Sequence, residues 1–187
     1  MAEAIVTKTL FANAFKELLL TFPYSQISIR EICEKCSMNR KSFYYHFKDK
    51  EDLVNWIFET EFIAYARNHT YESVWDAIED LLKYFYSNLN FYKKVLFHEG
   101  QNSFALYFNE LIYSIFVQQL QNILHDSSLQ ESQLNFVADG MICTLKRWQS
   151  ATNCTPPSVF IEEIKSGAKI MASYIVQTLP ETEKTTL

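Results

Sequence analysis

Glycine and proline are scarce in this sequence, which has only 3 glycines and 4 prolines among its 187 residues. Both residues interrupt helices, so their scarcity permits long helical segments. No stretch alternates apolar and polar residues for long enough to predict a β-strand. Together these absences favour an all-α protein and argue against a β-sheet fold.

Long apolar runs are missing too, which excludes another class of protein. No run approaches the roughly 20 apolar residues that a membrane-spanning helix needs. The first residues, Met1-Ala2-Glu3-Ala4, lack the basic and apolar regions of a signal peptide. We therefore expect a cytoplasmic protein without a membrane partner, in which 48% hydrophobic residues supply a substantial core.

The motifs of common enzymes and metal sites are also absent. The sequence has no G-x-S-x-G motif, phosphate-binding loop or dinucleotide fingerprint. Cys33 and Cys36 form a C-x-x-C pair, but no second Cys or His pair lies at zinc-finger spacing. We predict no catalytic residue, no metal site and no cofactor. The alternative class is an enzyme or helical binding protein that uses an aromatic cavity, with the N-terminal helices as a scaffold.

What the sequence does contain is a helix-turn-helix pattern between residues 28 and 50. Ser28 followed three residues later by Glu31 is a capping box, which begins one short helix. Asn39 is a good N-cap for a second helix, and Ser37-Met38 leaves only a tight turn between the two. This order of elements is typical of a DNA-reading module.

The second helix has one apolar face and one basic, aromatic face. Phe43 and Phe47 are four residues apart and are expected to face the core. Arginine can donate two hydrogen bonds to a guanine edge, while Lys, Ser and Tyr can bind phosphates or bases from the major groove. The candidate DNA-reading side chains on the remaining surface are Arg40, Lys41, Ser42, Tyr44 and Tyr45.

A third feature, the start of the next helix, adds a candidate phosphate site. Asp49 is its expected N-cap and Lys50 lies in its first turn, where backbone N–H groups and an ammonium can bind a phosphate. Residues 1–50 contain 8 Lys and Arg against 5 Asp and Glu, whereas residues 51–187 contain 9 against 17. The basic N-terminal part is therefore expected to approach DNA.

The segment SFYYHFKDKEDL, residues 42–53, resembles the signature of the TetR family of transcriptional regulators. The resemblance implies an all-α fold, with a three-helix DNA-binding domain at residues 1–50 and a helical bundle for ligand binding and dimerisation at residues 51–187. In this family the fourth helix connects the two parts. Glycine is usual in the family where this chain has Ser37, and frequent where it has Lys41.

Carried over by position, the resemblance implies base contacts from Arg40, Lys41 and Tyr44. It implies phosphate contacts from Ser42, Tyr44 and Lys50, and His46 also matches the family motif. The predicted DNA-binding residues are therefore Ser28, Asn39, Arg40, Lys41, Ser42, Tyr44, Tyr45, His46 and Lys50. Their partner is double-stranded operator DNA, read as a palindrome by a homodimer.

In addition to the two short helices, apolar residues at helical spacing predict longer ones at residues 4–22, 50–68, 72–88, 91–98, 103–125, 130–151 and 157–178. Each of the last two carries an apolar face, and Gly140 and Gly167 allow close helix approach. We predict an intersubunit four-helix bundle, although both faces could instead belong to the core of one protomer. The predicted dimer residues are Val137, Met141, Leu145, Trp148, Ile164, Ala168, Met171 and Ile175.

The middle of the chain is rich in aromatic residues, which either enclose an apolar pocket or fill a packed core. The resemblance implies a small-molecule effector, whose identity does not transfer between members of the family. The candidate ligand-binding residues are Trp75, Phe85, Phe97, His98, Phe104, Tyr107, Phe108 and Tyr113.

Residues 84–108 also resemble the C-terminal region of regulators related to the dihydroxyacetone kinase operon activator. In that branch a regulatory protein partner, rather than a buried ligand, is implied to carry the signal. Repression is the default action of the family, and activation of such an operon is the alternative.

Overall fold

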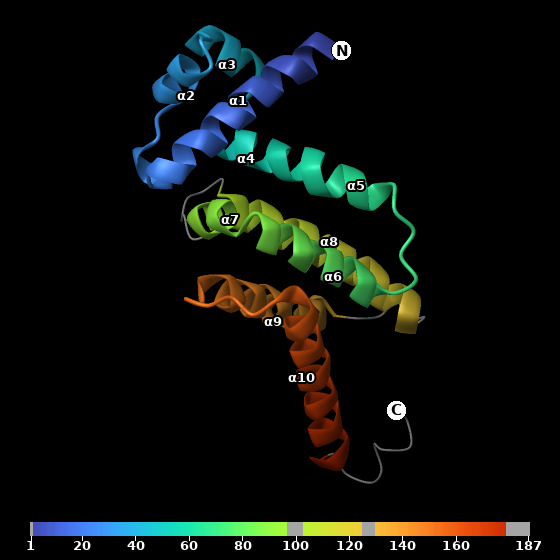
Figure 1. Cartoon of the computed structure of the whole chain (residues 1–187). Helices are drawn as coiled ribbons and strands as arrows, with labels where there is room; N and C mark the ends of the chain where they lie inside the picture. Colours follow the sequence, from blue (N-terminus) through green and yellow to red (C-terminus); the bar gives the residue numbers. More distant parts are fainter. Residues whose placement is uncertain (1, 97–102, 125–129, 179–187) are drawn as a thin grey trace.

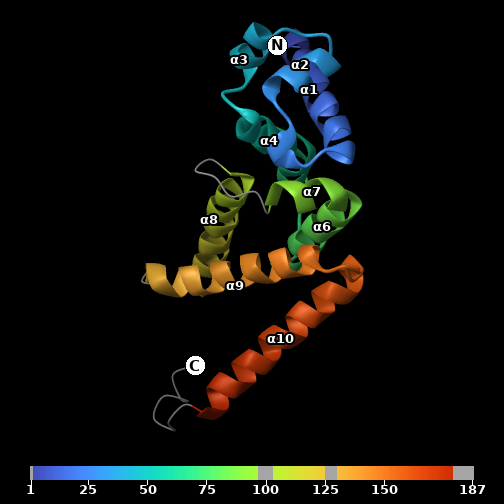
Figure 2. The same cartoon turned by 90° about the vertical axis from the view of Figure 1, so that its left-hand side faces the viewer.

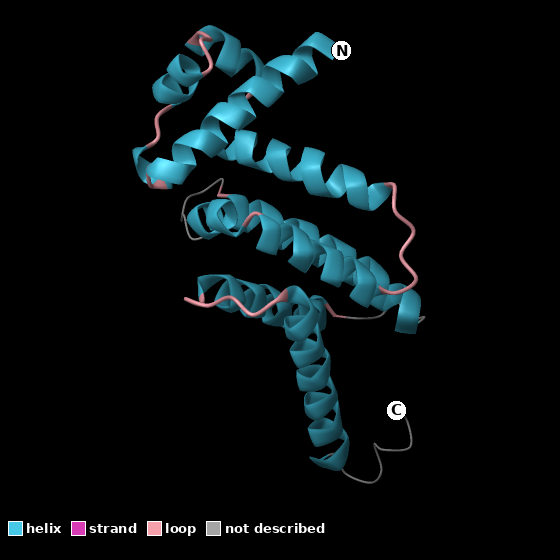
Figure 3. Ribbon diagram, viewed as in Figure 1, coloured by secondary structure: helices cyan, strands magenta, loops and turns pink. Residues whose placement is uncertain are grey.

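The computed structural model describes residues 2–96, 103–124 and 130–178, and these ranges contain helices and loops but no strand (Figure 3). Helix α1 (Ala2–Thr21), the short turn η1 (Tyr24–Gln26), α2 (Ile29–Lys35) and α3 (Arg40–His46) form a unit at one end of the molecule (Figure 1). The predicted all-α class and N-terminal three-helix unit are confirmed.

A long helical segment joins this unit to the body. It consists of α4 (Lys50–Phe58), the π-helical turn η2 (Glu59–Ile63) and α5 (Ala64–Arg67), which follow one another without a break. The sequence predicted one helix over 50–68 and gave no sign of the π turn. Such a turn carries an extra residue, which shifts the side chains after it around the helix axis.

The body contains α6 (Val74–Ser87), α7 (Leu89–Leu96), α8 (Phe104–Leu124), α9 (Glu131–Ser150) and α10 (Pro157–Thr178). Helices α6 to α8 lie below α4 and α5, and α9 crosses beneath them (Figures 1 and 2). Helix α10 leaves the end of α9 at an angle, and its second half extends away from the body. In the described parts of the chain, no helix is long and apolar enough to cross a membrane.

The N-terminal unit closes around its own aromatic side chains. The Phe11 ring on α1 lies 5.2 Å from the Phe43 ring and 6.3 Å from the Phe47 ring, in edge-to-face contacts. All three side chains are fully or almost fully buried. Edge-to-face pairs of this kind stabilise a core beyond the area they bury. They hold α3 in one orientation against α1.

Helix α7 contacts both the N-terminal unit and the C-terminal end of α9 in the body. The Lys94 ammonium donates a hydrogen bond to the Leu19 carbonyl oxygen in the last turn of α1. The neighbouring Lys93 ammonium donates to the Ala151 carbonyl oxygen, 2.8 Å away, at the end of α9. Cations stabilise the free carbonyls and the negative end of a helix dipole. One short helix therefore caps two helices, one in each part.

Candidate nucleic-acid interface

The turn between α2 and α3 has the geometry of a helix C-cap. The Met38 N–H donates to the Cys33 carbonyl oxygen (2.9 Å) and the Ser37 N–H donates to the Glu34 carbonyl oxygen (3.2 Å). These are the two hydrogen bonds of a Schellman motif, whose C′ residue has a left-handed backbone. Ser37 occupies that position with φ 55°. The turn thus requires a conformation that glycine adopts more readily than serine.

We expect Ser37→Gly to raise the free energy of unfolding by about 1 kcal/mol, because it removes the steric cost of the left-handed conformation. Urea denaturation followed by circular dichroism measures the change. Ser25→Gly is the matched control: Ser25 is exposed in η1 without a positive φ, so no gain is expected there. An equal effect of both substitutions would contradict the left-handed turn.

Capping side chains fix the starts of both short helices. The Ser28 hydroxyl accepts from the Glu31 N–H (3.2 Å), while the Glu31 carboxylate accepts from the Ser28 hydroxyl and N–H, both at 2.7 Å. These bonds, the hydroxyl contribution first, lower the pKa of Glu31. Asn39 accepts from the Ser42 N–H at 2.8 Å. Ser28 and Asn39 therefore order the helix starts through their side-chain oxygens.

Helix α3 presents a basic and aromatic face to solvent. With Phe43 buried on the opposite side, Arg40, Lys41, Tyr44 and Tyr45 are exposed, Tyr45 to 82%. The Arg40 guanidinium donates to the Tyr44 hydroxyl (3.4 Å) and lies 5.9 Å from the centre of its ring. This contact places the guanidinium along the helix surface. Ser42 and His46 are half-buried at the edges of this face.

Lys50 does not lie on the exposed face of α3. Its ammonium donates to the carbonyl oxygens of Tyr24 (3.0 Å) and Ile27 (2.5 Å) and lies 4.5 Å from the centre of the Tyr24 ring. Burial lowers the pKa of Lys50. The Lys50 ammonium thus has protein partners in this structure, and the phosphate contact expected for it stays a prediction. The exposed cation at the α3–α4 link is Lys48, which was not among the predicted DNA-binding residues.

The aromatic residues expected to line a pocket largely form a packed core. Phe85, Phe104 and Phe108 are at most 2% exposed and surround Phe58, with ring centroids 5.9, 5.3 and 5.8 Å from it. These three rings therefore pack against other rings in the core, and a ligand contact from them stays a prediction. Phe97 and His98 lie outside the described residues.

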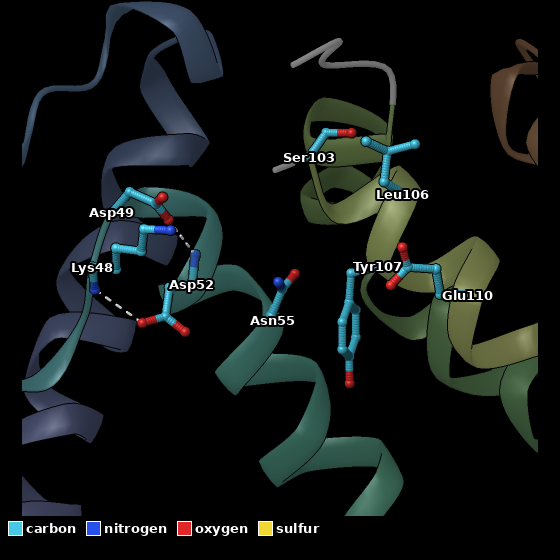
Figure 4. Close-up of a pocket in the computed structure, with 8 residues that line it drawn as sticks. All are labelled: Lys48, Asp49, Asp52, Asn55, Ser103, Leu106, Tyr107 and Glu110. Carbon is cyan, nitrogen blue, oxygen red and sulfur yellow. Dashed lines mark hydrogen bonds between the residues drawn. The ribbon is translucent and has the colours of Figure 1, made fainter. Parts of the chain in front are cut away.

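The other three candidate ligand residues are only half-buried. The Lys165 ammonium on α10 lies over the Trp75 ring on α6, 6.0 Å from the centre of that ring. Tyr113 lines a cavity of about 240 Å³ between α8 and α9. Tyr107 lines another, of about 360 Å³, between the start of α4 and α8 (Figure 4). The sequence did not place this second cavity, because its walls are polar and come from segments far apart in the chain.

The predicted dimer face divides into two parts. Leu145 and Trp148 are 3% and 4% exposed within one protomer, and Trp148 stacks on Phe160 with ring centroids 4.9 Å apart. Both side chains are therefore buried within their own protomer, and a contact between them and a partner stays a prediction. Val137, Met141 and Ile164 are half-buried, Ala168 and Met171 are exposed, and the described side chains do not include that of Ile175.

A different face of α10 exposes several apolar side chains, with Glu163 between Val159 and Gly167 on the same face. Ile170 and Tyr174 are 68% and 69% exposed, and they follow Val159 and Gly167 at helical spacing. A side-chain carbon placed on Gly167 meets no atom within 4 Å. Phe136 on α9 is likewise 63% exposed. We call the four α10 residues Val159, Gly167, Ile170 and Tyr174 the α10 outer face.

A capped helix-turn-helix that presents a basic, aromatic helix, attached to a larger helical body, defines a class of DNA-binding transcription factor. Comparison with known proteins identifies the family. The profile described as "Bacterial regulatory proteins, tetR family" matches residues 13–57, and the profile "Transcriptional regulator C-terminal region" matches residues 72–169, just over half of the chain. The protein belongs to the TetR family of transcriptional regulators.

Individual relatives agree with this assignment. The HTH-type dhaKLM operon transcriptional activator DhaS of Lactococcus lactis is 29% identical over 151 residues, 79% of this chain and 81% of that protein. The structure of the dihydroxyacetone kinase operon activator DhaS covers 89% of this chain and 98% of its own, with 22% identity and a TM-score of 0.60. A TetR regulator from Streptococcus agalactiae covers 87% and 93%, with 21% identity and a TM-score of 0.67.

Proposed function

We propose that this regulator binds a palindromic operator as a homodimer, with α3 of each protomer in the major groove. The observation that carries the proposal is the exposed face of α3, where Arg40, Lys41, Tyr44 and Tyr45 stand together on a rigidly capped helix. Arginine and lysine bind guanine edges, and tyrosine and serine bind phosphates. Residues 1–50 form the DNA-binding part in this proposal, and residues 51–187 the regulatory and dimerisation part.

The α10 outer face is proposed as the centre of the dimer. Exposed apolar side chains on both sides of a glycine permit two helices to pack closely across a two-fold axis, with Glu163 toward one end of the contact. Ala168 and Met171, on the neighbouring side of the same helix, extend this surface. A two-fold dimer sets the separation of the recognition helices and therefore favours a palindromic site.

Activation of a dihydroxyacetone-kinase-like operon is the more specific proposal. Its support is the relative named as a transcriptional activator of the dhaKLM operon, which aligns with four-fifths of this chain. Repression, the default of the family, is the alternative, and the position of the operator relative to the promoter decides between them. The regulatory signal is proposed to be a small-molecule effector or a regulatory protein partner.

Selection of genomic fragments with the purified protein, followed by binding measurements on the enriched site, tests the proposal. We expect a palindrome, and we expect Arg40→Ala to weaken binding to it by about tenfold or more through loss of a base contact. Binding to random DNA, which depends on phosphate contacts, is expected to change much less. Fluorescence anisotropy at two salt concentrations measures both.

The matched control is Arg67→Ala, which removes an exposed arginine on α5, away from α3. It should leave operator affinity unchanged. If Arg40→Ala lowers affinity equally for operator and random DNA, Arg40 binds phosphate rather than bases. Failure to enrich any fragment over random DNA would refute the proposed function.

A further inference from the structure

A series of polar contacts crosses from the N-terminal unit into the body. The Lys16 ammonium on α1 lies 2.5 and 2.6 Å from the two carboxylate oxygens of Glu61, which belongs to the π turn η2. The same carboxylate accepts a hydrogen bond from the Tyr84 hydroxyl on α6 (3.1 Å), and the hydroxyl oxygens of Tyr84 and Tyr92 are 2.7 Å apart. We call Lys16, Glu61, Tyr84 and Tyr92 the α1–body bridge. It connects α1, η2, α6 and α7.

The body holds its end of the bridge in one arrangement. Tyr92 is completely buried, and burial raises the pKa of both Tyr92 and Tyr84, so both hydroxyls keep their protons at neutral pH. Because the Tyr84 hydroxyl donates its proton to Glu61, the Tyr92 hydroxyl donates to the Tyr84 oxygen. Each of the two protons therefore has an acceptor, and the body fixes the direction of the Glu61 carboxylate.

The other end of the bridge moves with the recognition helix, because α3 packs on α1 through buried aromatic rings. Figure 2 shows α6 and α7 beneath this N-terminal unit. Two further contacts attach α1 to α7: the Phe15 and Phe91 rings, 6.1 Å apart, and the hydrogen bond from Lys94 to the last turn of α1. The Lys16–Glu61 ion pair attaches α1 to a different element, η2. Attachments to two elements restrict the angle between the N-terminal unit and the body.

This ion pair contributes more to geometry than to stability. The side chains of Lys16 and Glu61 are 29% and 38% exposed, and ion pairs with that much exposure contribute little to the free energy of unfolding. A charge-assisted contact with both carboxylate oxygens nevertheless favours one placement of the ammonium. In a dimer, the angle of each N-terminal unit on its body decides how far apart the two α3 helices lie.

We propose that Lys16 and Glu61 are positioning residues, which set the angle of the N-terminal unit and thereby the half-site spacing that the dimer accepts. Neither residue belongs to the exposed face of α3, and neither is assigned a contact with DNA. They act through α1 on the placement of α3. The inference rests on the proposed function, because a preferred spacing exists only for a two-fold dimer on a palindrome.

Operators that differ only in the spacer between their half-sites test this role. A spacer changed by two base pairs moves one half-site by about 7 Å along the duplex and about 70° around it. We expect the wild type to bind the selected spacing at least about tenfold more tightly than spacers two base pairs longer or shorter. In Lys16→Met, which removes the ammonium from the bridge, this preference is expected to fall to about threefold or less. Fluorescence anisotropy measures each affinity.

A second variant interrupts the bridge on the body side, and each variant has a matched control. Tyr84→Phe removes one hydroxyl, and we expect it to weaken the spacing preference as Lys16→Met does. Lys35→Met also removes an ammonium from the N-terminal unit, but its ion pair with Glu17 (2.9 Å) lies within that unit. Tyr65→Phe removes a hydroxyl that donates to Asp80 (3.3 Å), between α5 and α6. Both controls should keep the wild-type spacing preference.

Binding to a single half-site separates positioning from loss of fold. On DNA with one half of the palindrome scrambled, Lys16→Met and Lys35→Met should bind within about twofold of each other, because α3 is unchanged in both. Equal losses at every spacing would show a merely structural role and refute the inference. An unchanged spacing preference in both Lys16→Met and Tyr84→Phe would also refute it, since the contacts of α1 with α7 would then suffice. A wild type that binds all spacings equally would contradict the proposed dimer itself.

Discussion

Replacing Phe58 with alanine is expected to lower the free energy of unfolding by about 3–5 kcal/mol. The Phe58 side chain is completely buried at the end of α4, where the connecting helix meets the body. Its removal leaves a cavity that surrounding rings cannot close, because they also pack on one another. The rings within contact distance are those of Phe62, Tyr84, Phe85, Tyr92, Phe104, Tyr107 and Phe108. Urea denaturation of the purified variant measures the loss.

Phe22→Ala is the control for this substitution, because the Phe22 ring is 44% exposed after the end of α1. It should cost less than about 1 kcal/mol. If Phe58→Ala costs as little, the ring faces open space, and the aromatic residues enclose a ligand cavity after all. Because α4 joins α3 to the body, the same variant also reports whether the aromatic core supports operator binding.

Introducing a charge on the α10 outer face is expected to abolish the dimer. A two-fold dimer of Ile170→Asp would bury two unpaired carboxylates, one from each protomer, at a cost of several kcal/mol. In the monomer both carboxylates stay in water, so the monomer is favoured. A monomer engages one half-site at a time, so operator affinity is expected to fall by about a hundredfold. Sedimentation velocity measures the mass, and fluorescence anisotropy measures the affinity.

Leu20→Asp provides the matched control, since Leu20 is 74% exposed on α1, outside the α10 outer face. This variant should stay dimeric. An Ile170→Asp protein that sediments as a dimer with normal operator affinity would contradict the proposed interface, and would direct attention to Phe136 on α9. Circular dichroism separates loss of association from loss of fold, because α10 contacts the body through its first half, where Phe160 and Ile161 are buried.

The helix-turn-helix could be predicted from sequence because its determinants are local. Ser28 and Glu31 form the capping box that their spacing indicated, and Asn39 caps α3 as expected. Such hydrogen bonds form between residues three positions apart, so the order of residues nearly specifies the geometry. The range of a helix could be predicted for the same reason. Helix α10, predicted over residues 157–178, has those bounds in the structure.

Residues whose role depends on distant partners could not be predicted in this way. Lys50 appeared in the sequence as a lysine at a helix start, but its ammonium contacts carbonyl oxygens 23 and 26 residues earlier in the chain. Leu145 and Trp148 lie on an apolar helix face, and periodicity does not tell whether such a face is covered by the same chain or by a second copy. The tertiary structure covers it with the protomer's own helices.

By itself, the sequence determined that this protein is all-α, carries a helix-turn-helix near its N-terminus and belongs to a family of DNA-binding regulators, because helix periodicity, caps and a local motif are short-range properties. Only the tertiary structure decided that Phe58 and its neighbours fill a core, that the apolar strip left free on α10 includes Ile170, and that a polar cavity lies between α4 and α8. Each of these depends on which surfaces meet when distant helices pack, and packing is a property of the whole chain.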